Sequence, residues 1–108
     1  MVKIADIIGK TSAILHADGL KVYNSLVEEI VRTPKIVVSF AGLEHCTTSF
    51  LNASIGKLLM NSPEAGERIS YVDTDEMLRA KIEKVRSNAL NESLRQAHDE
   101  SVREYFEA

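Results

Sequence analysis

The chain of 108 residues has little of several features that mark specialised classes of protein. Its one cysteine, Cys46, has no second cysteine for an internal disulfide, so we expect a reducing compartment, which is the cytoplasm by default. No apolar run approaches the roughly 20 residues that cross a bilayer. The first residues also lack the basic segment and apolar run of a signal peptide. The sequence therefore predicts a soluble, cytoplasmic protein with no membrane partner.

The chain also has no large excess of positive or negative charge. The formal net charge is -3, and the basic residues are interleaved with acidic ones. Binding to nucleic-acid phosphates needs clustered, uncompensated Lys and Arg, so we expect no nucleic-acid partner. The three histidines and Cys46 lack the spacing of zinc ligands, and the five glycines are too scattered to form a phosphate-binding loop. The sequence predicts no metal and no cofactor.

The residues that are present predict a single α/β domain. Hydrophobic residues make up 44% of the chain and charged residues 27%, as in ordinary globular proteins. We expect a mixed central sheet of about four strands with helices packed against it. Residues 1–75 should form the core, and residues 76–108 a helical segment of the same domain. The strands are expected at 2–8, 11–16, 35–40 and 68–72, with a helical turn as the alternative for 11–16.

Apolar spacing predicts the helices between these strands. The first helix should be capped by Asp18 and end before Pro34. The second should begin at a Thr-Thr-Ser triplet and end at Asn61-Ser62-Pro63. A long helix should begin at about Thr74, with a kink or break near Ser87-Asn88 where its apolar stripe changes register.

The segment from Lys35 to Met60 is the best candidate for the functional site. The apolar run 35–40 is typical of a central parallel strand, and its carboxyl end meets the start of the second helix. Such a junction presents unsatisfied N–H groups and the hydroxyls of Thr47, Thr48 and Ser49, so it is a place to hold, receive or display a phosphate. The simpler interpretation is that the triplet only caps the helix.

A catalytic role is not expected. His45 and Cys46 are adjacent, but nothing in the sequence supplies a third group to orient them, so we do not expect an enzyme. Gly42 and Gly56 are assigned to a turn and to helix packing. Phe50 and Leu51 are expected in the core, with partial exposure to a partner as the alternative.

The run KIVVSFAGLEHCTTSFLNASIGKLL resembles the STAS-like domains, relatives of the anti-sigma-factor antagonists, and in particular an uncharacterised bacterial branch with a "TSSFLN-GKL" motif. Residues 3–9 and Asp18-Gly19 also look like that branch, so the resemblance spans about residues 2–75. It implies that Ser49 matches the serine that a partner kinase phosphorylates in typical antagonists, with Thr48 before it. Thr47 and Phe50 stand where those antagonists have Asp and Gly.

The resemblance implies a regulatory protein-binding module, switched by phosphorylation of Ser49 or Thr48, that docks through residues 41–60. Its partner would be a histidine-kinase-like ATPase. The C-terminal helix carries apolar residues beyond the region of resemblance, so we expect it either to pack on the domain or to pair with a second copy of the chain. The alternative is a small-ligand or nucleotide sensor with an anion site at residues 47–50. The expected partner contacts are Thr47, Thr48, Ser49, Phe50, Asn52 and Ala53.

Overall fold

The computed structural model describes the backbone of residues 1–107 and the side chains of residues 1–92. Its main sheet has three parallel strands in the order β1–β3–β5, and a separate parallel pair joins β2 to β4. The prediction of one mixed sheet of about four strands is therefore corrected. Every pairing in the described backbone is parallel, and the second pair lies apart from the main sheet. The strands are β1 (Val2–Lys3), β2 (Ser12–Ala13), β3 (Ile36–Ser39), β4 (His45–Cys46) and β5 (Ile69–Val72).

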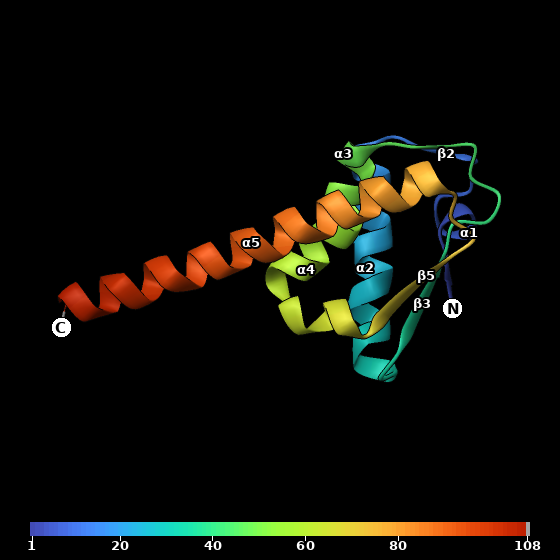
Figure 1. The fold of residues 1–108 in the computed structure, drawn as a ribbon. Coiled ribbons are helices and arrows are strands. Elements are labelled where there is room, and N and C mark those ends of the chain that lie inside the picture. Colours follow the sequence, from blue (N-terminus) through green and yellow to red (C-terminus); the bar gives the residue numbers. More distant parts are fainter. Residues whose placement is uncertain (108) are drawn as a thin grey trace.

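Strand β3 lies at the centre of the main sheet, as its apolar run predicts. Ile36 pairs with Ile69 of β5, and Val38 pairs with both Val2 of β1 and Tyr71 of β5. Ile36 and Val38 are almost completely buried, because the helices cover their face of the sheet. In Figure 1, α2, α4 and the first half of α5 stand together on one side of β3 and β5.

Apart from α1, which was not expected, the long helices follow the predicted order. After the short helix α1 come the long α2, a continuous run from α3 through a π-helical segment to α4, a short 3-10 helix and the long α5. The Asn61-Ser62-Pro63 stop and the start of α5 lie close to their predicted places. The bounds are α1 (Ile4–Ile8), α2 (His16–Arg32), α3 (Thr48–Leu51), the π segment η1 (Asn52–Gly56), α4 (Lys57–Asn61), η2 (Pro63–Glu67) and α5 (Glu76–Glu107).

The first segment differs from the prediction. Residues 2–8 were expected to form one strand, but only Val2 and Lys3 do, and residues 4–8 form the helix α1. Ile4 and Ile8 are both buried, and a spacing of four residues places them on one face of a helix. Gly9 ends the helix in the left-handed conformation (φ 68°), and its amide donates to the Ala5 carbonyl.

Two helix predictions are also wrong. Helix α2 begins at His16, so Asp18 is not its cap but lies inside the first turn, where Lys10 reaches its buried carboxylate (2.6 Å). Helix α5 continues through Ser87-Asn88 as one helix, because Val85 and Ala89 stay buried on one face across that point.

The second half of α5 extends away from the other elements, as Figure 1 shows. The expected pairing of two copies through the C-terminal helix depends on side chains that lie outside those described. No helix in the described part of the chain is long and apolar enough to cross a membrane.

Candidate docking site

The turn that follows β3 is held in place by backbone hydrogen bonds. The Leu43 amide donates to the Phe40 carbonyl (3.2 Å), and Gly42 has the positive φ of 82° that glycine adopts at little cost. His45 and Cys46 then pair with Ser12 and Ala13 to form β4. The turn is thereby fixed against the segment that leads into α2.

Thr47 is the N-cap of α3. Its Oγ1 accepts a hydrogen bond from the Phe50 amide (3.2 Å) and donates one to the Ile14 carbonyl (3.2 Å). Its own amide donates to the Ala13 carbonyl (3.0 Å). The capping interpretation is confirmed for this residue, and its hydroxyl is already engaged on both sides.

Thr48 and Ser49, the candidate phosphorylation sites, lie in the first turn of α3 with exposed side chains. Asn52, the first residue of the π segment, is also exposed. Because these three residues are exposed, another protein can reach them.

Phe50 and Ala53 point into the core instead. Phe50 is fully buried and Ala53 is 3% exposed, and Leu51 beside them is also fully buried. A Cβ added to Gly19 would lie 2.7 Å from the Ala53 Cβ, which shows how closely α2 packs here. The prediction that Phe50 and Leu51 belong to the core is confirmed. Two of the six expected partner contacts, Phe50 and Ala53, therefore lie inside the domain, and a third, Thr47, has its hydroxyl engaged within it, so these three leave the docking site.

A π-helical segment separates α3 from α4, and no sequence signal indicated it. The buried Ser54 donates its hydroxyl to the Phe50 carbonyl (2.9 Å) within this segment. At its end Gly56 faces α5, because an added Cβ would lie 3.2 Å from Val85 Cγ1. The packing role predicted for Gly56 is confirmed, and the close approach fixes the helix that carries Ser49.

Two exposed aliphatic residues lie beside the triplet. Ile14 is 45% exposed and Leu15 is 55% exposed, and the bond from Thr47 to the Ile14 carbonyl holds them against the start of α3. Figure 1 shows this connection after β2 passing next to α3. The sequence reasoning missed both residues because it began α2 at Asp18. No local signal could have shown their approach to the triplet, because it follows from the pairing of β2 with β4 and from the Thr47 bond. We name Ile14, Leu15, Thr48, Ser49 and Asn52 the docking surface.

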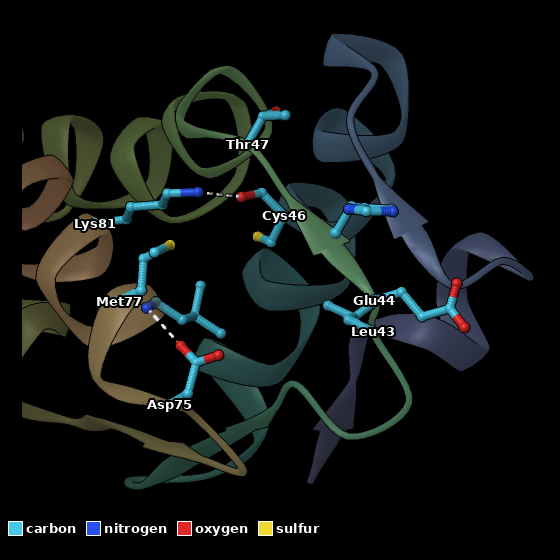
Figure 2. A pocket seen from close by; sticks show the side chains of 9 residues that line it. Leu43, Glu44, Cys46, Thr47, Asp75, Met77 and Lys81 are labelled. Atoms are coloured by element: carbon cyan, nitrogen blue, oxygen red, sulfur yellow. Dashed lines mark hydrogen bonds between the residues drawn. The ribbon is translucent and has the colours of Figure 1, made fainter.

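On the other side of Thr47 a cavity of about 280 Å³ separates the turn from α5. Figure 2 shows Cys46 and Met77 facing this cavity from opposite walls, with Leu43 and Asp75 below them. The Lys81 ammonium donates to the Cys46 carbonyl (3.1 Å) and so ties α5 to the strand that precedes the triplet.

Cys46 does not have the environment of an activated nucleophile. Burial raises the pKa of its thiol to about 11, although the nearby Lys81 acts in the opposite direction. The thiol therefore stays protonated at neutral pH, whereas a catalytic cysteine needs a lowered pKa. Among the described residues no group of His, Cys, Asp and Glu side chains is arranged to hold a metal ion.

Comparison with known proteins agrees with the resemblance seen in the sequence. The model of one family, described as "STAS-like domain of unknown function (DUF4325)", matches residues 18–79. This range contains β3, the turn that follows it, the triplet and β5. No curated protein and no solved structure matches the chain. Because the family match covers more than half of its residues, the chain belongs to this family of STAS-like domains.

Proposed function

We propose that this STAS-like domain is a regulatory module that binds a protein partner through the docking surface, and that phosphorylation of Ser49, or of Thr48 beside it, switches the contact. Membership of the STAS-like family supports a regulatory or protein-interaction role. The proposal of a contact that phosphorylation switches rests on one local observation. Exposed Ile14 and Leu15 lie beside exposed hydroxyls at the start of a helix.

This arrangement suits a switch for physical reasons. Aliphatic side chains that stay half exposed in the free domain gain free energy when a partner covers them, about 25 cal/mol for each Å² of apolar surface. A phosphate on Ser49 would place nearly two negative charges in the same contact, and their desolvation and repulsion would oppose docking. The start of α3 would meanwhile favour the dianion in the free domain, by ~0.3–1 kcal/mol.

The partner in this proposal is a histidine-kinase-like ATPase, the class that the sequence resemblance implies. Such a partner would both bind the docking surface and transfer the phosphate that releases it. The domain itself contributes no catalysis in this scheme, because its part is to present a hydroxyl and an apolar contact.

The test compares capture of partners from the native cell by four variants. Ile14→Asp should lose the partner, whereas Val31→Asp should keep it, because Val31 is an equally aliphatic residue, 83% exposed, at the far end of α2. Ser49→Asp should lose the partner and Ser49→Ala should keep it. Equal capture by Ile14→Asp and the wild type would remove the docking surface, and retained capture by Ser49→Asp would remove the switch.

The alternative is an anion or nucleotide site at the start of α3. The first helical bond of α3 runs from the Leu51 amide to the Thr47 carbonyl, so the Thr48 and Ser49 amides precede it and lack helical partners. Calorimetry with ATP tests this alternative: heat of binding that Ser49→Asp abolishes would support the anion site, and the absence of both heat and a thermal shift would exclude it.

A further inference from the structure

A second candidate for binding is the outer edge of β5, the last strand of the main sheet. The strand order β1–β3–β5 leaves β5 with one neighbour in the described structure. Its residues, Ile69 to Val72, include neither a charged residue nor proline. Exposed edges in natural proteins are usually protected by such residues, because an open edge is a template for another strand.

The hydrogen bonds of β5 show which backbone groups point outward. The Ile36 amide donates to the Arg68 carbonyl (2.8 Å), and the Phe40 amide donates to the Val72 carbonyl (3.1 Å). Backbone groups alternate in direction along a strand, so the even-numbered residues of β5 face β3. The N–H and C=O groups of Ile69 and Tyr71 therefore face away from the sheet, where an added strand would bond to them.

A cavity of side-chain size lies beside this edge. It has a volume of about 340 Å³ and is lined by Tyr71 and Thr74 at the end of β5 and by Arg79, Ile82 and Glu83 of α5. We name it the edge pocket. In strand addition, main-chain bonds supply affinity and pockets for alternate side chains supply specificity. The outward groups of β5 and the edge pocket together match that mode of recognition.

The charged residues that line the edge pocket indicate which side chains an added strand would carry. Glu83 is compensated by Arg86, whose Nη1 lies 3.4 Å from its carboxylate. Arg79 donates through Nε to the Thr74 hydroxyl (2.8 Å), but it forms no ion pair in the part of the chain whose side chains are described. Arg79 is therefore the exposed cation of the lining that is left without an ion pair among the described side chains, and it can pair with an acidic group of a partner.

We propose that the β5 edge binds an extended segment of a partner protein as a fourth strand, with an apolar side chain of that segment in the edge pocket and an acidic one beside Arg79. This interaction is separate from the docking surface, which lies at the start of α3. It gives the domain a second contact that phosphorylation of Ser49 does not block.

The test selects a phage-displayed library of random linear peptides on the full chain. The strongest peptide is then synthesised and titrated into the wild type, Arg79→Glu and Lys84→Glu. Lys84 is the matched control, because it is an exposed cation on the same helix that does not line the edge pocket. Amide hydrogen exchange of Ile69 and Tyr71 is measured with and without the peptide.

The proposal expects apolar peptides with an acidic residue. Their binding should slow exchange of the Ile69 and Tyr71 amides, and Arg79→Glu should weaken it by about tenfold or more, the effect of losing a charge-assisted bond. Lys84→Glu should bind as the wild type does. Three results would overturn the proposal: no enriched peptide, peptides whose binding leaves both amides unprotected, or a dimer of the free chain in which both amides are already protected.

Discussion

Tyr71 presents the clearest single-residue anomaly in the domain. Its hydroxyl is buried with no hydrogen-bond partner among the described residues, and burial raises its pKa to about 12. A buried polar group without a partner costs ~1–3 kcal/mol. Its ring packs against Phe40, with centroids 6.4 Å apart, and a phenylalanine would keep that contact. The ring therefore stabilises the core and the hydroxyl does not.

Tyr71→Phe is expected to leave the free energy of unfolding unchanged or to raise it by up to about 1 kcal/mol, because only the unpartnered hydroxyl is lost. Tyr23→Phe is the control, since the Tyr23 hydroxyl accepts a bond from Asn61 (3.1 Å) and its loss should cost ~0.5–1.5 kcal/mol. Urea denaturation measures both. A clear loss of stability in Tyr71→Phe would show that the hydroxyl has a partner, such as a buried water.

Asp18 gives the domain an acid-sensitive contact. The hydrogen bond from Lys10 lowers the pKa of the Asp18 carboxyl below its ordinary value, and burial acts against this shift. A carboxyl with a lowered folded-state pKa stabilises the fold above its unfolded pKa of ~3.9, and the contribution is lost as the pH falls through the folded value.

Lys10→Met should therefore be less stable than the wild type at neutral pH, and the two should converge in acid, once Asp18 is protonated in both. Urea midpoints measured across the acid range test this. Lys84→Met removes an exposed lysine away from Asp18 and should show no such convergence. A constant difference between Lys10→Met and the wild type at every pH would contradict the assignment.

At the scale of elements, the start of α2 departs from the local structural preference for helix caps. Leu15 occupies the N-cap and forms no side-chain capping bond, although Asp, Asn, Ser and Thr are preferred there. It is also 55% exposed, so the core gains little from it. Departures from local preference concentrate at functional sites, and this one lies on the docking surface.

Leu15→Asp should consequently raise the free energy of unfolding, by about 0.5–1 kcal/mol through the new cap, while it weakens partner binding. Thermal unfolding and partner capture test the two effects separately. Leu15→Ala adds no cap and should weaken binding without the gain in stability. Full binding by Leu15→Asp would show that Leu15 is not part of the contact.

The elements also show what sequence patterns can and cannot predict. The strand β3 was identified by its almost wholly apolar, β-branched run, and the continuous helical run from Thr48 to Asn61 is long enough for apolar spacing to identify it. Residues 4–8 could not be assigned in this way, because a short β-branched run fits a strand or a buried helical turn equally well. The pair β2–β4 depends on contacts between residues 33 positions apart, as in Ser12 with His45, which no local pattern reports.

At the scale of the whole molecule, the sequence identified the Thr-Thr-Ser triplet as part of the candidate site but did not show which residues surround it in space. It identified the junction after β3 and the capping role of the triplet, now confirmed at Thr47. It missed Ile14 and Leu15, because their approach to the triplet follows from the pairing of β2 with β4 and from the Thr47 bond. It also counted Phe50 and Ala53 as contacts, because a linear motif does not show which side of its helix faces the core.

The two proposed contacts lie on different parts of the domain. The docking surface groups residues from the start of α2 and the start of α3, while the edge pocket lies between β5 and α5. Lys81 of α5 also bonds to the carbonyl of Cys46, immediately before the triplet. This bond and the packing of Gly56 on Val85 both link the helix that lines the edge pocket to the segment that carries Ser49.

The measurement that tests the central claim most directly is mass spectrometry of the chain isolated from its native cell, separated into partner-bound and free fractions. The peptide that contains Thr48 and Ser49 reports the phosphate in each fraction. The account predicts an unmodified peptide in the bound fraction and phosphate on Ser49 or Thr48 in the free fraction. Phosphate on these residues in the partner-bound fraction would contradict it.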